Sequence, residues 1–390
     1  MNAFDFYAPT KMVFGNGSFE RLGEETALWG TCVLLVKQDG PLKEMGVYKK
    51  AVEIMEKQGL SVWELDGIVS NPRLKRITDG ISLCKKENID VVVGVGGGSA
   101  IDAAKAIAVG APYDGDVWDF FARESAIKVA LPIIAVSTVA AAGAEVSCHS
   151  VVTNDKESDS SKWQKWAIHD PNAFPKVAII DPELQTSMPA RLTAAGMCDI
   201  ISHVLEGYFD GVPYNPLSDR IGEGLVLTVL ECDSVLKQPD DLNARGSLAW
   251  AASLAISGLQ DCGRSNAGFP AHWIQHAVGA ITDSSHGEGL AVIEPAWLVF
   301  RNSKNPEKFA QFAQRVFHIQ RSATDKDYDI GLAGIEALKE RYKSWGMPAT
   351  LREIGVTKDM LPIIVDSVLQ SPETYVFERE ELIQVLESCY

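Results

Sequence analysis

The feature that most constrains the fold is a short apolar segment that leads into a glycine-rich loop and then into a helical pattern. Residues 89–95 are rich in β-branched side chains and are bounded by glycines, a composition that favours a buried parallel strand. The loop that follows contains three consecutive glycines and Ser99, and the helical pattern continues through Lys105. A strand, a tight loop and a helix in this order predict one unit of an α/β domain with a parallel sheet.

Strand and helix patterns alternate through the first half of the chain. Four further apolar runs predict strands, at residues 31–37, 61–66, 132–136 and 177–181. Helical patterns at residues 43–58 and 74–88 separate consecutive strands, which implies a parallel sheet with right-handed crossovers. The polar stretch at residues 154–162 is predicted to be a surface loop.

The pattern changes after about Pro189. Helical periodicity then runs almost without interruption, and no convincing strand pattern follows. A chain of 390 residues is also long for a single core. We therefore predict two domains, an α/β N-terminal domain with a parallel sheet at residues 1–185 and an all-α C-terminal domain at residues 186–390.

Composition and charge exclude several classes of protein. The formal net charge of −16 and the sequence pI near 4.9 argue against binding to nucleic acid or to an anionic membrane surface. No apolar run approaches the roughly 20 residues that span a bilayer, and residues 1–10 lack the pattern of a signal peptide. The seven cysteines form no C-x-x-C pair, which fits reduced thiols. We therefore expect a cytoplasmic globular protein.

The glycine loop has the features of a phosphate-binding turn. Glycines allow the backbone to approach a phosphate, and the start of the next helix presents free N–H groups and the positive end of the helix dipole. Ser99 stands where the common dinucleotide motif has its last glycine, so a simple tight turn is the alternative interpretation. Asp39 follows the strand at residues 31–37 and could accept hydrogen bonds from a ribose, with a plain turn residue as an equal alternative.

Two groups of histidines predict a metal site in the helical half. Asp199 and His203 are four residues apart, which places them on one face of a helix whose other residues are mostly apolar. His272 and His276 have the same spacing, and His286 stands where the next helix would begin. One carboxylate and up to three imidazoles suit Fe²⁺ or Zn²⁺, whereas core histidines with local hydrogen bonds are the alternative. Most cysteines and three other histidines are expected to be structural, namely His149, His169 and His318.

With these motifs in place, the chain resembles the iron-containing alcohol dehydrogenase family, and within it the butanol dehydrogenase and aldehyde reductase branch. The likeness covers nearly the whole length, and the motifs occur in the same order. They lie at residues 4–17, 70–73, 94–105, 115–121, 180–182, 199–203, 272–287 and 295–297. The resemblance implies a dehydroquinate-synthase-like architecture, in which an α/β dinucleotide-binding domain and a helical domain enclose the cofactor and the metal.

The resemblance also implies a role for each candidate residue. The metal ligands correspond to Asp199, His203, His272 and His286, which would hold Fe²⁺, with Zn²⁺ as the alternative. His276 matches a position near the nicotinamide and the substrate that is credited with proton relay. The residues that match cofactor-binding positions are Asn71, Gly97, Gly98, Ser99, Asp102, Thr138 and Lys165.

Two departures from the family pattern bear on the cofactor. After the first strand the branch usually carries a glycine-rich segment, where this chain has Lys37, Gln38 and Asp39. A carboxylate there would repel the 2′-phosphate of NADPH, so we expect NAD(H) to be favoured over NADP(H). The family's Thr and Ser near the nicotinamide are replaced by Ala142 and Ala144. Each lost hydrogen bond would weaken cofactor binding by about 0.5–1.5 kcal/mol.

These features predict a metal-dependent NAD(P)(H) alcohol dehydrogenase or aldehyde reductase that interconverts primary alcohols, such as butanol, and aldehydes by hydride transfer. We expect a homodimer that acts on small molecules and binds neither nucleic acid nor membrane. Two alternatives stay open, a polyol dehydrogenase or dehydroquinate-synthase-like lyase of the same fold, and a metal- or nucleotide-binding protein with weak catalysis. Such a lyase needs a basic cluster for an anionic substrate, whereas apolar residues near the histidines indicate an apolar pocket: Phe269, Trp273, Ile274 and Trp297.

Overall fold

The chain forms two compact units in the computed structural model, which describes residues 1–265, 268–373 and 375–390. Ala8–Ser187 make the α/β unit, and Met1–Tyr7 with Met188–Tyr390 make the helical unit. The backbone N–H of Asn2 donates to the carbonyl of Gly263 at 2.9 Å, which ties the first residues to the helical unit. The sequence carries no sign of this attachment, because an irregular segment has no periodicity. That the first unit binds the cofactor and the second the metal stays a prediction.

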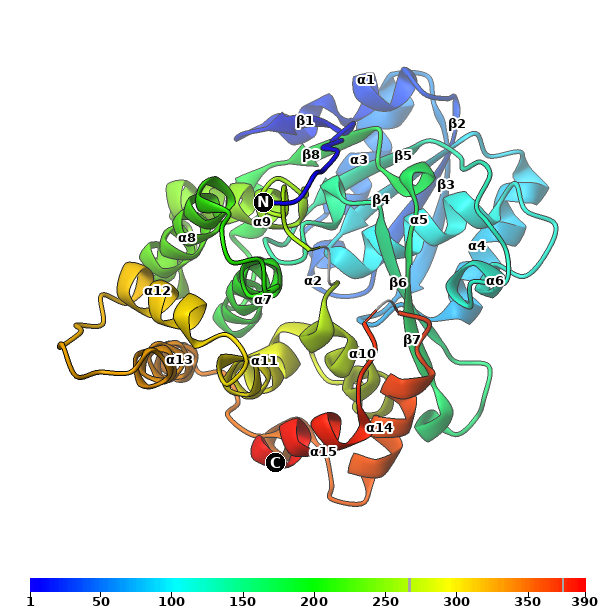
Figure 1. Ribbon diagram of the computed structural model, residues 1–390. Coiled ribbons are helices and arrows are strands. Elements are labelled where there is room, and N and C mark those ends of the chain that lie inside the picture. The colour runs from blue at the N-terminus through cyan, green and yellow to red at the C-terminus, as the bar shows by residue number, and fades with distance from the viewer. Residues whose placement is uncertain (266–267, 374) are drawn as a thin grey trace. The chain divides into compact units, whose positions relative to one another are not determined.

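A six-stranded parallel sheet forms the centre of the α/β unit (Figure 1). The strands follow the order β1-β8-β5-β4-β2-β3, and every neighbouring pair is parallel. Their bounds are β1 Lys11–Phe14, β2 Cys32–Gln38, β3 Ser61–Ile68, β4 Val91–Gly96, β5 Ile133–Ser137 and β8 Val177–Ile180. The predicted α/β fold class with a parallel sheet is confirmed. Strand β1 was not predicted. It lies at a sheet edge and only one of its four residues is buried, so its sequence forms no apolar run.

Helices cover both faces of this sheet. Their bounds are α1 Leu22–Ala27, α2 Pro41–Glu44, α3 Val47–Lys57, α4 Leu74–Glu87, α5 Gly98–Gly110 and α6 Trp118–Phe121. On one face, Met55 of α3 belongs to the same buried cluster as Val93 of β4. On the other face, Ile77 of α4 and Ile107 of α5 cluster with Val92. Neighbouring residues of one strand thus enter different cores, which explains why β4 is apolar at every position.

An antiparallel hairpin of β6 (His149–Asn154) and β7 (Gln164–His169) lies outside the main sheet. It is bonded to α5, because the Ser150 hydroxyl donates to the carbonyl of Asp102 at 2.8 Å and the Val151 N–H donates to the Asp102 carboxylate at 3.1 Å. The predicted surface loop joins the two strands and is mostly exposed. The hairpin was not predicted, because both strands mix polar and apolar residues without strict alternation.

Helices and short turns make up the helical unit, and its described residues include no strand. The α-helices are α7 Ala190–Tyr208, α8 Pro216–Glu231, α9 Leu242–Ile256, α10 Pro270–Thr282, α11 His286–Asn302, α12 Pro306–Val316, α13 Asp327–Ser344, α14 Met360–Gln370 and α15 Arg379–Ser388. Helix α7 is buried on nearly every side, and α8, α9 and α11 pack against it. A helix that is apolar on all sides belongs in the centre of a bundle, and α7 has this position.

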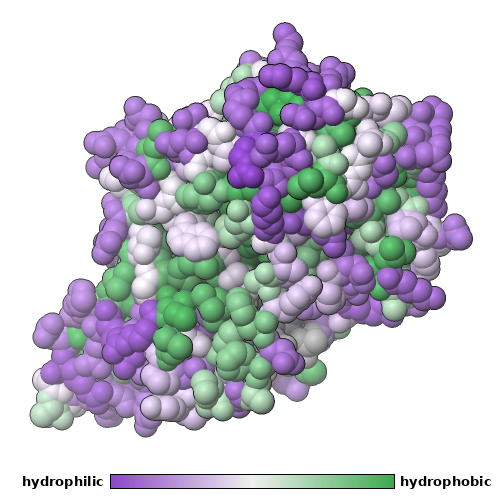
Figure 2. Space-filling view, turned by 90° about the horizontal axis from the view of Figure 1, so that it is seen from above, coloured by the Kyte–Doolittle hydropathy of each residue, from purple (hydrophilic) through white to green (hydrophobic). Residues whose placement is uncertain are grey.

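Figure 2 shows one face of the molecule coloured by hydropathy. Hydrophilic residues are spread over most of this face, and a group of hydrophobic residues gathers in its lower central part. The hydrophilic surface agrees with the formal net charge of −16. Across the described parts of the chain, no helix combines the length and the apolar composition that crossing a membrane requires.

Candidate active site

Four predicted ligand residues meet within the helical unit. One carboxylate oxygen of Asp199, Oδ1, lies 3.6 Å from Nδ1 of His203, 3.5 Å from Nε2 of His272 and 3.5 Å from Nε2 of His286. These distances are long for hydrogen bonds. They fit ligand atoms that share one ion, since tetrahedral Zn²⁺ with bonds of about 2.0–2.2 Å separates its ligands by roughly 3.3–3.6 Å.

Three helices bring these side chains together. Asp199 and His203 lie one turn apart near the middle of α7, as their spacing predicts. His272 lies in the first turn of α10, and His286 is the first residue of α11. Asp283 ends α10 in the left-handed conformation, with φ of 55°, so the chain turns sharply into α11. The cluster thus combines the centre of one helix with the beginnings of two others.

Burial leaves several of these polar atoms without a hydrogen-bond partner among the described residues. They are Oδ1 of Asp199, Nδ1 of His203 and Nε2 of His272. The three side chains belong to residues that are only 4%, 7% and 5% exposed. Unpaired buried polar atoms cost free energy, and here they point toward one another. The donor set and the unpaired atoms therefore fit a divalent metal held by nitrogen and oxygen ligands.

The two buried histidines next to Asp199 differ as bases. Burial lowers the pKa of His203 to about 4, against the opposing charge of Asp199. Burial also lowers the pKa of His272, but its interactions with the carboxylates of Asp199 and Glu206 outweigh this effect and raise that pKa to about 9. A metal must bind both imidazoles in the neutral form. Metal binding at neutral pH would therefore displace a proton from His272.

Two residues that the sequence analysis missed orient the histidines. Oε1 of Glu206 lies 3.2 Å from Nδ1 of His272 and also accepts the backbone N–H of His272 at 3.1 Å. Oε1 of Gln275 accepts a hydrogen bond from Nδ1 of His286. Both contacts use Nδ1 and leave Nε2 directed at Asp199, an arrangement that is common around metal-binding histidines. The available signal was spacing, because Glu206 follows His203 by one helical turn.

His276 lies beside the cluster without belonging to the ligand group. It is one turn after His272 on α10 and is 8% exposed. Its ring centroid is 5.6 Å from that of His286. Asp199, His272 and His286 each offer a ligand atom within 4.8 Å of the others, and this group includes neither His276 nor His203. His203 is joined to it through the 3.6 Å separation between its Nδ1 and Asp199. The division into four ligands and a neighbouring proton-relay residue stays a prediction.

The apolar residues predicted to line a substrate pocket have different positions. Phe269 lies against the cluster, with its ring centroid 5.9 Å from His203 and 5.5 Å from His272. Trp273 and Ile274 belong instead to the buried core that α10 shares with α14 and α15. Helical periodicity explains the difference, because consecutive residues face different sides of α10. Phe269, the residue just before the helix, has the predicted contact with the histidines.

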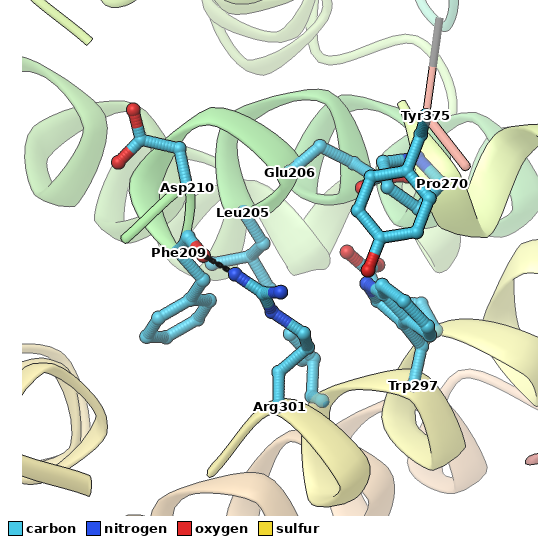
Figure 3. Close-up of a pocket in the computed structure, with 10 residues that line it drawn as sticks. Leu205, Glu206, Phe209, Asp210, Pro270, Trp297, Arg301 and Tyr375 are labelled. Carbon is cyan, nitrogen blue, oxygen red and sulfur yellow. Dashed lines mark hydrogen bonds between the residues drawn. The ribbon is translucent and has the colours of Figure 1, made fainter. Parts of the chain in front are cut away.

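A small pocket lies beside Glu206 and is lined by residues of α7, α10 and α11 (Figure 3). Glu206 forms part of its wall, together with Arg301 and the buried Glu294. The Arg301 guanidinium donates to the carbonyl of Phe209 at 3.2 Å, the dashed bond in Figure 3. Burial and the nearby charge of Glu206 raise the pKa of Glu294 well above its usual value. The pocket therefore includes in its wall the carboxylate that contacts Nδ1 of His272.

The glycine loop lies at the carboxyl end of β4, in the α/β unit. A Cβ on Gly96 would come within 2.7 Å of the Cβ of Ala100, so the loop has no room for a side chain there. The N–H of Gly97 donates to Oε1 of Gln38 at 2.9 Å, which links the loop to the end of β2. Gly98 begins α5, and a Cβ there would be 3.7 Å from that of Ala142, an ordinary contact. The open face of the loop thus lies at Gly98, where backbone N–H groups begin a helix.

The other predicted cofactor residues lie near carboxyl ends of strands or on the hairpin. Asn71 follows β3 in the left-handed conformation, with φ of 55°, and its Oδ1 accepts a hydrogen bond from Lys165 of β7 at 2.8 Å. Thr138 follows β5, and its N–H donates to the carbonyl of Gly96 at 3.0 Å. Asp102 accepts from the hairpin, as described above. In parallel sheets, ligands bind at the carboxyl ends of strands.

Asp39 lies at an exposed turn, whereas Ala144 is part of the local apolar core. Asp39 is exposed, and its carboxylate accepts the N–H of Gly67 at 3.2 Å. It therefore acts as a turn residue, and it still presents a negative charge after β2. Ala144 is buried in a small cluster with Ile101. A serine there would place a hydroxyl in an apolar setting, so the alanine is suited to its local packing.

Comparison with known families decides the assignment. Residues 9–182 match the family described as iron-containing alcohol dehydrogenase, and residues 193–390 match the C-terminal part of the Fe-containing alcohol dehydrogenase family. The chain belongs to the iron-containing alcohol dehydrogenase family. The resemblance inferred from the motifs is thereby confirmed.

Members of this family that resemble the chain differ in nucleotide. NADH-dependent butanol dehydrogenase A of Clostridium acetobutylicum is 33% identical over 397 residues, with 100% of each chain covered. An NADPH-dependent aldehyde reductase of Escherichia coli is 28% identical over 391 residues, with 98% of this chain and 97% of that one covered. The crystal structure of NADH-dependent butanol dehydrogenase A from Thermotoga maritima superposes with a TM-score of 0.93 at 36% identity, covering 100% of this chain and 99% of that one.

Replacing Glu206 by glutamine tests whether this carboxylate orients a ligand. The variant keeps the side-chain shape but removes the charge that faces Nδ1 of His272. Loss of such a partner costs about 10–100-fold in metal affinity, and we expect that decrease for Glu206→Gln. Competition for Zn²⁺ against a chelator would measure it. The control is Glu231→Gln at the exposed end of α8, which should leave the affinity unchanged. Equal affinities in the two variants would contradict the role of Glu206.

Proposed function

We propose that the chain is a metal-dependent NAD(P)(H) alcohol dehydrogenase that interconverts primary alcohols and their aldehydes by hydride transfer. The observation that carries the proposal is the group of buried, unpaired ligand atoms around Asp199. The family and the butanol dehydrogenase and aldehyde reductase relatives support the substrate class. The homodimeric state and the cytoplasmic location stay predictions that rest on the resemblance and on composition.

We assign Asp199, His203, His272 and His286 as the ligands of one divalent metal, Fe²⁺ according to the family and Zn²⁺ as the alternative. When bound, the metal supplies a Lewis acid for the oxygen of the alcohol or aldehyde. The chain contributes four ligands on helical segments, and Glu206 accepts the hydrogen bond from Nδ1 of His272 that holds this imidazole in one tautomer. Phe269 contributes an apolar wall beside two of the ligands.

Loss of one ligand tests the metal site and the function together. We expect His203→Ala to lose most of its metal and the NADH-dependent reduction of butanal, because its Nδ1 faces the carboxylate that anchors the site. Elemental analysis and steady-state NADH oxidation are the measurements. The control is His318→Asn, at an exposed position whose left-handed conformation asparagine tolerates. A full metal content in His203→Ala would contradict the ligand assignment, whereas a metal-loaded wild type without activity on butanal would contradict the function.

We propose that His276 exchanges the proton that accompanies hydride transfer. Oxidation of an alcohol releases a proton and reduction of an aldehyde consumes one, so a group that titrates near neutral pH is useful beside the reaction. His276 is largely buried and lies next to His286, one turn away from His272. This position is adjacent to the metal ligands, and the residue is therefore suited to pass a proton onward.

Removal of the imidazole should separate proton transfer from metal binding. We expect His276→Ala to keep its metal while kcat falls by about 100-fold or more, the usual contribution of a positioned acid or base. The profile of kcat against pH should also change, because the imidazole that exchanges the proton is gone. Metal analysis and pH-rate profiles of both proteins are the measurements. A metal loss as large as that of His203→Ala would make His276 a ligand instead.

We assign the pyrophosphate of NAD(H) to the beginning of α5, at Gly97, Gly98 and Ser99. The reason is physical, since the N–H groups at the start of a helix and the positive end of the helix dipole favour a phosphate there. We assign additional cofactor contacts to Asn71, Asp102, Thr138 and Lys165. NADH is proposed as the preferred nucleotide because the exposed carboxylate of Asp39 follows β2. The NADH-dependent relative from Clostridium acetobutylicum supports this preference, and the NADPH-dependent one from Escherichia coli is the counterexample.

Asp39→Asn tests the nucleotide preference without disturbing the turn. Asparagine keeps an acceptor for the N–H of Gly67 but removes the charge that would repel a 2′-phosphate. At an exposed site we expect discrimination of about tenfold to a hundredfold in wild type, or roughly 1.4–2.8 kcal/mol, and most of it should disappear in the variant. The measurement is kcat/KM for NADH and NADPH, with Asp79→Asn on α4 as the control. An unchanged ratio would limit Asp39 to its role in the turn.

A further inference from the structure

Three possible metal ligands meet at the open end of the hairpin, away from the loop that joins its two strands. His149 and His169 are paired residues of β6 and β7, and Nε2 of His149 lies 2.6 Å from Nδ1 of His169. Sγ of Cys148, the residue just before β6, lies 3.5 Å from the same Nδ1. One atom of each side chain lies within 4.8 Å of the other two. These residues belong to the α/β unit and were expected from sequence to be structural.

The fold holds this group firmly in place. Lys105 of α5 donates through its Nζ to the carbonyl of His149 at 2.7 Å, which fixes the start of β6. The N–H of Asp170 donates to the carbonyl of Cys148 at 3.4 Å, which closes the open end of the hairpin. Cys148 is 4% exposed, whereas His169 is exposed. The group is thus anchored by a buried sulfur and remains open to solvent at one imidazole.

We propose that Cys148, His149 and His169 form a second metal site, which takes a thiolate-binding ion such as Zn²⁺. Tetrahedral Zn²⁺, with a bond of about 2.3 Å to sulfur and about 2.0–2.1 Å to nitrogen, places those ligands roughly 3.5 Å apart. The separation between Cys148 and His169 already has this value. The two imidazoles lie closer, at a hydrogen-bond distance of 2.6 Å, so the ion replaces their shared proton and they separate slightly. Solvent supplies the fourth ligand through the exposed side.

The charges around the group suit a bound thiolate. Burial raises the pKa of the Cys148 thiol to about 11, and the ammonium of Lys105 partly opposes this rise. Partial burial of its ring and the positive charge of Arg123 lower the pKa of His169, against the opposing charge of Asp170, and this favours its neutral, ligating form. The ammonium of Lys105 thus favours a thiolate at Cys148, while the carboxylate of Asp170 favours a bound cation. The thiol proton leaves to solvent when the metal–sulfur bond forms.

Thiolate ligation distinguishes this site from the Asp199 cluster. The first site has only oxygen and nitrogen ligands, whereas the second has a sulfur. Cobalt(II) bound to a thiolate has a sulfur-to-metal charge-transfer absorption in the near ultraviolet, which oxygen and nitrogen ligands do not produce. Titration of the purified full-length protein with Co²⁺ should therefore generate this band, and addition of Zn²⁺ should remove it. Equilibrium dialysis should show about one equivalent of Zn²⁺ beyond that held by the Asp199 cluster.

Variants assign the band to its residues. Cys148→Ser and His169→Ala should each abolish it or weaken Co²⁺ binding at least about tenfold. His169 is exposed, so its truncation tests the site even if Cys148→Ser fails to fold. Cys32→Ser, at a half-buried thiol elsewhere in the same unit, should leave the band intact. Asp199→Asn should also leave it intact, which keeps this test independent of the proposed function. Absence of the band in wild type, or its persistence in Cys148→Ser and His169→Ala, would overturn the second site.

Discussion

A carboxylate buried in the middle of a helix is the constraint on which the helical unit depends. Asp199 is 4% exposed and lies on α7, whose neighbours are largely apolar. A buried charge requires partners, and the nearest ones are nitrogen atoms of His203, His272 and His286. Helices α10 and α11 therefore begin next to Asp199, because His272 lies in the first turn of α10 and His286 is the first residue of α11. Glu206, also on α7, strengthens the arrangement, because it accepts the backbone N–H of His272 at the start of α10.

In the α/β unit, the constraint on which the structure depends is the close packing of α5 against β4. A Cβ on Gly94 would come within 2.9 Å of the Cβ of Ala104, so only glycine lets α5 lie this near to β4. The start of α5 is thereby held between the ends of β2 and β5, through Gln38 and Thr138. The glycines thus serve two purposes. Gly94 permits the packing, and Gly98 begins the helix at the point where we propose that a phosphate binds.

Local patterns predicted much of this structure, and the rest depends on contacts between distant residues. The apolar runs of β2, β4 and β5 identified the sheet because both of their faces are buried. Strand β1 and the β6–β7 hairpin were missed, since short strands owe their stability to partners elsewhere in the chain. The spacing of Asp199 and His203 predicted that these two side chains share one face of a helix, and α7 has them one turn apart. The contact between Glu206 and His272 could not be predicted, because it joins two helices whose packing angle the sequence does not encode locally.

The proposed metal ligands lie far apart along the chain, and this separation has a consequence for folding. All of α8 and α9 lies between the ligands on α7 and the one at the start of α10, and His286 lies further on. An ion that binds these residues only in the folded chain stabilises the folded state by its binding free energy, because the unfolded chain does not hold the ligands together. Free metal at a hundred times its dissociation constant would add about 2.7 kcal/mol to the free energy of unfolding. Metal supply in the cell would then influence how much of the helical unit is folded, and so how long each copy of the protein survives proteolysis.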